Sequence, residues 1–226
     1  MLFLVVIDTQ KYHTRIGGIN FMKNVLVVKA NNRPDGVSTA MFNKFVENLD
    51  TTKVSVDTYD VYAQEMPYIG QTLFDAFGKL AENQELTADE QKLMNARQVA
   101  QEKFAKADVL VFAFPMWNLT IPAALHTFID YIFEAGFTFA YNEDGSMKQL
   151  QAGKEVILLN ARGGVYSGEA AAMEGAVSYM QKTFGAMFGM NIIEEVIIEG
   201  HNADPSRSAE IVAAGLDRVA AAAKAL

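Results

Sequence analysis

Five short runs of β-branched and aliphatic residues, separated by longer segments of helical character, constrain the fold of this chain most strongly. The runs span residues 25–28, 54–59, 109–114, 156–159 and 192–198. Several of them are apolar at consecutive positions, which is typical of strands covered on both faces. Because parallel neighbouring strands need helical crossovers, this alternation predicts an α/β fold in which helices cover both faces of a five-stranded, doubly wound parallel sheet.

Capping residues mark the start of two predicted helices. Thr87 and Glu90 have the spacing of a capping box, and Asp204 precedes Pro205 as an N-cap precedes the first helical residue. The segment 73–107 is longer than one crossover requires, so we expect it to contain two helices.

Composition limits the classes of partner. The chain has 226 residues, half of them hydrophobic, which is enough to bury the core of one domain, and no shift in composition divides residues 22–226. Its 27 acidic and 19 basic residues give a net charge of -8, which disfavours nucleic acid and anionic membranes as partners. There is no cysteine, and the three histidines are too scattered to suggest a metal site. This composition is compatible with a reducing, cytoplasmic setting.

The first 21 residues require a separate interpretation. Their apolar run, residues 2–7, has no positive charges before it and no cleavage site after it, and it is far shorter than the roughly 20 residues that a membrane span requires. Met22 directly precedes KNVLVVKAN, which has the pattern of an opening strand. We therefore expect residues 1–21 to be a dispensable N-terminal extension. The alternative is an additional edge strand, LFLVVI, whose deletion would make the protein insoluble.

The loop after the first predicted strand has the features of an anion site. Ligands of doubly wound sheets bind at the carboxyl ends of the strands. There, KANNRPDGVS brings Gly36 and Ser38 to the start of a predicted helix near Ser38 or Thr39. Free amides and a hydroxyl group at a helix start favour phosphate, although the loop matches neither the P-loop nor the dinucleotide-binding glycine pattern. The alternative is an ordinary loop in which Ser38 serves only as the N-cap.

The loop after the third predicted strand, FAFPMWNLTIP, ends an apolar run with large side chains in place of the usual turn residues. Pro115 turns the backbone outward, and Met116 and Trp117 follow it at the predicted mouth of the crevice. Apolar side chains beside amide groups suit a flat heterocycle, and Asn118 can bond a ring edge or brace the loop. The alternative for Met116 and Trp117 is packing in the core.

The loop after the fourth predicted strand, LLNARGGVYSG, has two consecutive glycines. Gly163 and Gly164 allow the backbone to approach a ligand and to form an anion-binding nest, and Arg162 adds positive charge. The alternative is a simple turn with Arg162 paired to a surface acid. An anion site, an apolar slot and a polar clamp at one sheet edge together describe a phosphorylated planar cofactor, and FMN fits that description.

Three sequence blocks carry a resemblance to a known family. VLVVKANNRP, FPMWNLTIPAALHTFIDY and LLNARGGVYS, in this order and with EGH near the end, resemble the bacterial FMN-dependent NADH:quinone oxidoreductases and azoreductases. The resemblance covers residues 22–226. It implies a flavodoxin-like fold with strand order 2-1-3-4-5 and a homodimer with its two FMN sites at the subunit interface.

The resemblance also implies the residues that contact FMN. These are Asn31, Gly36, Val37 and Ser38 around the phosphate, Pro115, Met116, Trp117, Asn118 and Leu119 around the isoalloxazine ring, and Asn160, Ala161, Arg162, Gly163 and Gly164 at its polar edge. Some relatives have serines where Ala30, Gly36 and Val37 stand in this chain. Phosphate binding must therefore depend on backbone amides, on Ser38, and on Asn31 or Arg33.

The family chemistry implied by the resemblance is ping-pong hydride transfer. NADH gives a hydride to flavin N5 and leaves, and a quinone or an azo compound then accepts it. Because the flavin carries the chemistry, no side chain is expected to act as an obligatory acid or base. His126 and His201 are interpreted as structural residues.

Four further residues are expected at the substrate. Phe139 and Tyr141 belong to a predicted hairpin, 137–148, and resemble substrate-wall positions of relatives. Met187, with Phe188 beside it, stands where some relatives contribute a phenylalanine from the partner subunit. The alternative for the hairpin aromatics is plain hairpin packing.

Two other functions share this fold. A flavodoxin-type electron carrier would keep one flavin edge free for a protein partner, and NADH alone would not reduce it rapidly. A non-catalytic flavodoxin-like binding protein would be colourless and unable to take up FMN. The choice of quinone or azo compound, and of NADH or NADPH, is left open by the sequence.

Overall fold

The computed structural model describes residues 22–226, so the predicted extension, 1–21, lies outside the described residues. A five-stranded parallel sheet has the strand order β2-β1-β3-β6-β7. Its strands are β1 (Lys23–Lys29), β2 (Val54–Asp60), β3 (Val109–Pro115), β6 (Glu155–Arg162) and β7 (Asn191–Glu199). This confirms the predicted five strands and the order 2-1-3-4-5 of a flavodoxin-like fold.

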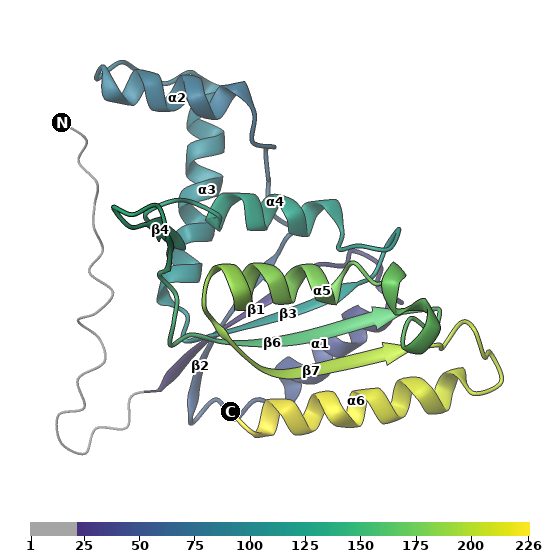
Figure 1. Ribbon diagram of the computed structural model, residues 1–226. Coiled ribbons are helices and arrows are strands. Elements are labelled where there is room, and N and C mark those ends of the chain that lie inside the picture. The colour runs from purple at the N-terminus through teal and green to yellow at the C-terminus, as the bar shows by residue number, and fades with distance from the viewer. Residues whose placement is uncertain (1–21) are drawn as a thin grey trace, which may run out of the picture.

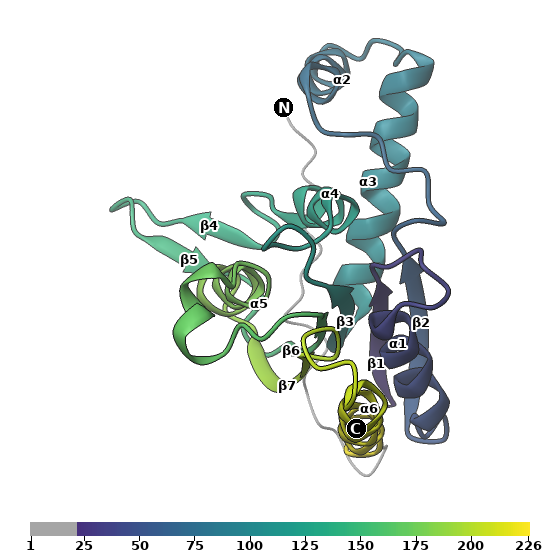
Figure 2. The ribbon, with the colours of Figure 1, turned by 90° about the vertical axis from the view of Figure 1, so that its right-hand side faces the viewer.

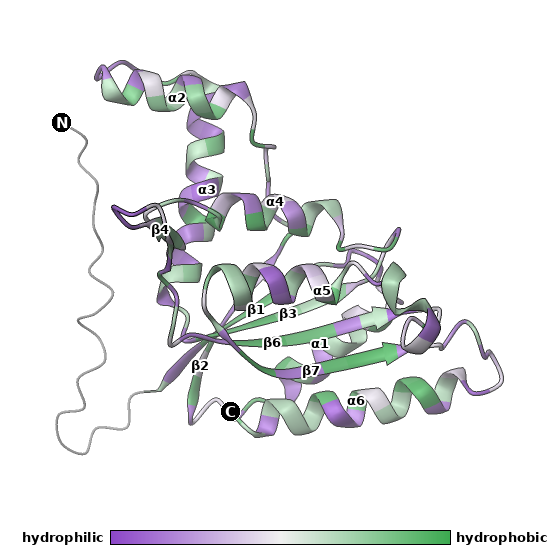
Figure 3. Cartoon of the chain, in the orientation of Figure 1, coloured by the Kyte–Doolittle hydropathy of each residue, from purple (hydrophilic) through white to green (hydrophobic). Residues whose placement is uncertain are grey.

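Alternate residues of the central strands face two separate hydrophobic cores. Leu110 and Phe112 of β3 belong to one core, whereas Val109 and Val111 belong to the other, and every residue of β3 is buried. Side chains of successive strand residues point to opposite faces, so a strand covered on both faces must be apolar throughout. Figure 3 shows the consequence as hydrophobic strands at the centre and mixed colouring on the helices.

The helices divide between the two faces of the sheet (Figures 1 and 2). One face carries α1 (Val37–Asn48) and α6 (Ser208–Lys224), and the other carries α3 (Ala88–Lys106), α4 (Ala123–Ile132) and α5 (Val177–Met180), which continues as a π-helical segment, Gln181–Met187. The helix α2 (Gln71–Ala81) lies at the far end of α3, away from the sheet. The segment 73–107 therefore contributes two helices, as predicted.

The two predicted helix starts have different outcomes. Thr87 is the N-cap of α3, and its capping box with Glu90 is complete. In contrast, α6 begins at Ser208 and not at Pro205, so the prediction of Asp204 as its N-cap was wrong. The carboxylate of Asp204 accepts a hydrogen bond from the Ser206 hydroxyl at 2.6 Å and closes a separate turn ahead of the helix.

A short hairpin lies at the edge of the sheet opposite the carboxyl ends of the strands. Its strands β4 (Phe139–Tyr141) and β5 (Met147–Gln149) pair in antiparallel fashion, which confirms the predicted hairpin. The helix α4 runs back from the carboxyl end of β3, so the hairpin emerges beside the beginning of β6 (Figure 1). A 3₁₀ helix, Gly168–Met173, lies after β6 at the carboxyl edge.

Neither a membrane-spanning helix nor a metal-binding cluster is found in residues 22–226. In that range, no helix combines the length and the apolarity that crossing a bilayer requires. The same residues also contain no cluster of three or more histidine, cysteine, aspartate or glutamate side chains suited to a metal ion.

Candidate functional site

The loops that follow β1, β3 and β6 meet around one cavity of about 240 Å³ at the carboxyl edge of the sheet. A fourth segment, the turn after β7, completes the wall. The lining residues are Asn31, Arg33, Gly36, Val37, Ser38, Pro115, Met116, Trp117, Ala161, Gly163, His201 and Asn202. The cavity therefore joins all three loops that the sequence singled out.

The start of α1 forms the anion-binding end of the cavity. Gly36 is the N-cap and makes no side-chain capping bond, so the alternative in which Ser38 is only an N-cap was wrong. Ser38 lies in the first turn and is 1% exposed, and its Oγ accepts a hydrogen bond from Asn31 Nδ2 at 2.8 Å. The Ser38 hydroxyl proton is thus free to be donated, next to amides that have no partner within the helix.

Asn31 and Arg33 brace this loop in different ways. Asn31 Oδ1 accepts the backbone N–H of Arg33 at 2.9 Å, so both ends of the Asn31 amide hold the loop in shape. The Arg33 guanidinium pairs with Asp35 at 2.8 Å, and this hydrogen-bonded pairing lowers the pKa of the Asp35 carboxyl. Arg33 lines the cavity but is exposed, and Asp35 neutralises its charge at the solvent side of the anion-binding end.

The residues after β3 form a tight two-residue turn. Trp117 and Thr120 exchange backbone hydrogen bonds at 2.9 and 3.1 Å, and the two residues between them, Asn118 and Leu119, have φ of 51° and 67°. Positive φ is unfavourable for a leucine, so the turn stores strain that its surroundings must maintain. Met116 and Trp117 line the cavity, whereas the side chains of Asn118 and Leu119 are exposed and do not.

The glycine loop after β6 is held against the turn that follows β7. The carbonyl of Gly163 accepts the N–H groups of Asn202 and Ala203 at 3.0 and 3.1 Å. A Cβ at Gly163 would lie 2.4 Å from Asn202 Nδ2, so any other residue here would require the Asn202 side chain to move. Within residues 22–226, the amides of Gly163 and Gly164 donate no hydrogen bond, and of the two residues Gly163 lines the cavity whereas Gly164 does not.

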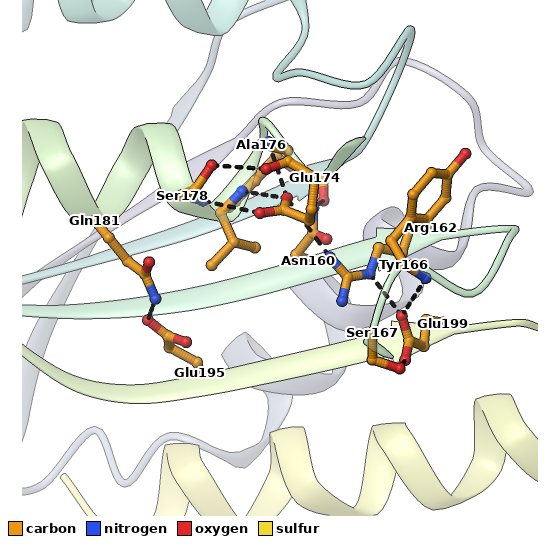
Figure 4. A network of polar contacts seen from close by, with 12 residues as sticks. Asn160, Arg162, Tyr166, Ser167, Glu174, Ala176, Ser178, Gln181, Glu195 and Glu199 are labelled. Atoms are coloured by element: carbon orange, nitrogen blue, oxygen red, sulfur yellow. Dashed lines mark hydrogen bonds and ion pairs between the residues drawn. The ribbon is translucent and has the colours of Figure 1, made fainter. Parts of the chain in front are cut away.

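Arg162 does not direct its charge into the cavity. Its side chain is 6% exposed and pairs with Glu199 at 3.0 Å and Glu174 at 3.5 Å (Figure 4). The side chain therefore does not make the predicted contact with a ligand. The alternative, a pair with a surface acid, does not fit either, because both carboxylates are largely buried. Asn160 is also buried and donates to the carbonyl of Phe114 at 3.2 Å, so its side chain braces two strands.

His201 and Asn202 are cavity residues that the sequence analysis did not assign to the site. His201 follows Gly200, whose φ of 80° turns the chain sharply after β7. Burial lowers the pKa of His201, and its Nδ1 is buried without a hydrogen-bond partner among the described residues. The imidazole is therefore neutral at neutral pH. His201 belongs to the sequence block EGH, which is part of the family resemblance. The residues around it do not indicate which loop His201 contacts, so its place in the cavity was not predicted.

The four predicted substrate residues lie away from this cavity. Phe188 is fully buried in the core against Phe104 and Phe184, which argues against its predicted contact with substrate. Phe139 is buried and Tyr141 is exposed on the hairpin, where their rings form an edge-to-face pair, and Met187 is partly buried. None of the four lines the cavity. The helix α4 leads the hairpin to the opposite edge of the sheet, and the helical segment 177–187 leads Met187 and Phe188 there in the same way.

The lining fits a phosphorylated planar ligand. The lining offers a hydroxyl donor and helix amides at the start of α1, the apolar surfaces of Met116 and Trp117, and a free amide of the glycine loop. The rings of Tyr62 and Trp117 lie close together, with centroids 6.5 Å apart. These features suit the phosphate, the ring face and the polar ring edge of FMN.

Comparisons with known proteins agree with this geometry. A family model described as "Flavodoxin-like fold" matches residues 23–223. An FMN-dependent NADH:quinone oxidoreductase of Bacillus cereus is 44% identical over 204 residues, which cover 88% of this chain and 97% of that protein. This chain belongs to the FMN-dependent NADH:quinone oxidoreductase family.

Solved structures of similar proteins extend the match to the fold. An azoreductase of Bacillus anthracis superposes with a TM-score of 0.81 at 42% identity, covering 91% of this chain and 100% of that one. An FMN-dependent NADH-azoreductase of the same species, solved in complex with FMN, has a TM-score of 0.79 at 27% identity, covering 89% and 98%. The family is thus one of oxidoreductases.

Proposed function

We propose that this chain is an FMN-dependent oxidoreductase that takes electrons from NADH and delivers them to quinones and azo compounds. The observation that carries the proposal is the convergence of three strand-end loops on one cavity that combines anion donors with apolar surfaces, as a phosphorylated planar cofactor requires. The family membership and the FMN-bound azoreductase of similar fold support the same cofactor.

Each loop would hold a different part of the cofactor. Ser38 and the first amides of α1 would hold the phosphate, Met116 and Trp117 would lie along the ring, and the amides of Gly163 and Gly164 would bond its polar edge. When bound, FMN would supply the redox chemistry by accepting a hydride at N5 from NADH and passing it to a second substrate that binds after NAD has left.

The side chains of this site bind and orient, and none is proposed as an obligatory acid or base. His201 stays neutral because its surroundings disfavour the charged form. A neutral imidazole adds no positive charge beside the ligand, so the favourable field for a phosphate comes from the start of α1.

We also propose a homodimer in which FMN lies at the interface. The helix α2 projects from the body of the chain with Phe74, Phe77 and Leu80 exposed at 63%, 39% and 48%. The cavity of about 240 Å³ is smaller than the roughly 300–1,000 Å³ typical of ligand sites, as expected if a second chain completes it. Tyr141 and Met187 could then serve the cavity of the partner chain. A cytoplasmic location is proposed with this function.

Anaerobic reduction tests the proposal. The purified protein should be yellow, NADH alone should bleach its absorption band rapidly, and a quinone or an azo dye added afterwards should restore the band. A flavodoxin-type carrier would stay yellow with NADH alone, and a non-catalytic binding protein would take up no FMN at micromolar concentration. Either of those results would overturn the proposal.

A further inference from the structure

Two loops of the candidate site are joined through the residues that precede α5. On one side, the backbone N–H of Gly175 donates to the carbonyl of Leu119 at 2.9 Å, and Leu119 is a strained residue of the turn that carries Trp117. On the other side, Glu174 lies beside Arg162, which begins the glycine loop. The pair Glu174–Gly175 therefore contacts both walls.

The contact with the turn after β3 tolerates no side chain. A Cβ on Gly175 would lie 2.6 Å from the carbonyl oxygen of Leu119, which is a backbone atom and cannot swing aside. The φ of Gly175 is not in the left-handed region, so close approach alone requires glycine here. The hydrogen bond from Gly175 satisfies the Leu119 carbonyl and adds to the two Trp117–Thr120 hydrogen bonds that hold the positive φ of the turn.

The contact with the glycine loop is electrostatic. Glu174 accepts the backbone N–H groups of Ala176, Val177 and Ser178 at 2.7 to 3.0 Å, which fixes its carboxylate at the start of α5 (Figure 4). That carboxylate lies 3.5 Å from Nη1 of Arg162.

The same guanidinium continues the connection to the far side of the glycine loop. Arg162 Nε donates to Glu199 at 3.0 Å, and Glu199 also accepts the backbone N–H of Tyr166 at 2.9 Å and the hydroxyl of Ser167. The glycine loop is thus held at both of its ends by one network centred on the buried Arg162 (Figure 4).

We propose that Glu174 and Gly175 are positioning residues, which hold the turn carrying Trp117 and the glycine loop at the separation that the flavin ring requires. The inference rests on the proposed function. It assigns no contact with the ligand to either residue: Gly175 acts through Leu119, and Glu174 acts through Arg162.

Trp117 is the single tryptophan of the chain, so its fluorescence reports on the turn without any cofactor. In cofactor-free Gly175→Ala, we expect acrylamide to quench Trp117 more strongly than in the wild type, and in the reconstituted protein we expect FMN affinity to fall by roughly tenfold, the effect of losing one good hydrogen bond. Gly185→Ala is the matched control, because a Cβ there makes only an ordinary contact, 3.4 Å from the Ile192 side chain, and Gly185 belongs neither to the cavity nor to α2. It should change neither signal.

A second variant covers the case in which Gly175→Ala fails to fold. Glu174→Gln keeps the shape of the side chain and removes its charge. Because the carboxylate holds the backbone on the C-terminal side of Gly175 as well as Arg162, Trp117 quenching should rise and FMN affinity should fall, each by less than in Gly175→Ala. Unchanged Trp117 quenching in the folded variants, or quenching that rises while FMN affinity stays at the wild-type value, would overturn the inference. A wild-type protein that binds no FMN would refute the proposed function, whereas the Trp117 measurement would still decide whether the turn is held.

Discussion

Ser38 shows how one buried hydroxyl is prepared for an anion. Its oxygen is already the acceptor of a hydrogen bond from Asn31, so its proton has no competing role within the loop. The first turn of α1 contains no acidic residue that would occupy the helix start in place of a ligand. A phosphate placed there gains a charge-assisted hydrogen bond and the favourable end of the helix dipole.

Replacing the Ser38 hydroxyl tests the contribution of phosphate binding apart from that of ring binding. We expect Ser38→Ala to weaken FMN binding by about 1.5–3 kcal/mol, the contribution of one hydrogen bond to a charged group. Titration of FMN fluorescence measures the effect, and riboflavin is the control, because it lacks the phosphate and should bind both proteins alike. Equal losses for FMN and riboflavin would show that the substitution disturbs the whole loop.

His201 is the titratable residue of the cavity whose charge depends most on burial. Its pKa is lowered by desolvation, so the unfolded chain takes up a proton at a higher pH than the folded chain. Stability associated with His201 is therefore fully present above its unfolded pKa and is lost as the pH falls below it.

This linkage predicts a pH-dependent difference in the free energy of unfolding. Between about pH 8 and about pH 5.5, the cofactor-free wild type should lose more stability than His201→Gln, because the unfolded histidine protonates near pH 6.5. Urea denaturation at the two pH values measures both proteins. Parallel losses in wild type and variant would contradict a buried, neutral His201.

At the scale of elements, local signals predicted what is determined locally. Runs of β-branched and aliphatic residues predicted all five strands. The run in β3 is apolar throughout because that strand is buried on both faces, whereas the edge strands β2 and β7 are partly exposed and include polar residues. The capping box at Thr87 was predictable because its two partners are three residues apart. The start of α6 was not, since Asp204 can close a turn or cap a helix with the same sequence.

The contacts of the candidate site were less predictable, because they join residues far apart in the chain. Arg162 meets Glu199 and Glu174 from separate segments, and the sequence could not distinguish these partners from a ligand. The position of the hairpin depends on the direction of α4, which places Tyr141 at the opposite edge from the cavity. The loops that supply the lining were predictable because every parallel strand ends at the same edge.

The capping box of α3 gives a prediction at this scale. Thr87→Ala should lower the free energy of unfolding by about 1 kcal/mol, because the N–H of Glu90 loses its acceptor. Thr87→Ser should retain most of the stability, since serine caps equally well. Urea denaturation compares the three proteins. A loss of FMN affinity in Thr87→Ala would contradict the account, because the cap does not line the cavity.

At the scale of the whole molecule, the projecting helix α2 exposes an apolar surface that nothing in a single chain covers. Its apolar side chains Phe74, Phe77 and Leu80 are exposed, although Arg97 covers one face of Phe77 with its guanidinium 5.4 Å from the ring centre. An apolar surface of this kind is stable in water when another surface covers it. A second copy of the chain is the occupant that the proposed function requires.

A charge on this helix should separate the two copies. We expect the wild type to have twice the 24.8 kDa mass of one chain in light scattering, and Phe74→Asp to have the mass of one chain and weaker FMN binding. Ile193→Asp is the control, because Ile193 is exposed on β7, far from α2. A wild type with the mass of one chain that still binds FMN tightly would refute the proposed interface.

The most direct test of the account is a crystal structure of the protein grown with FMN. We expect the phosphate to lie at the start of α1, within hydrogen-bond distance of Ser38 Oγ. The ring should lie between Trp117 and the amides of Gly163 and Gly164. FMN bound elsewhere on the chain, or a cavity that stays empty at saturating FMN, would contradict it.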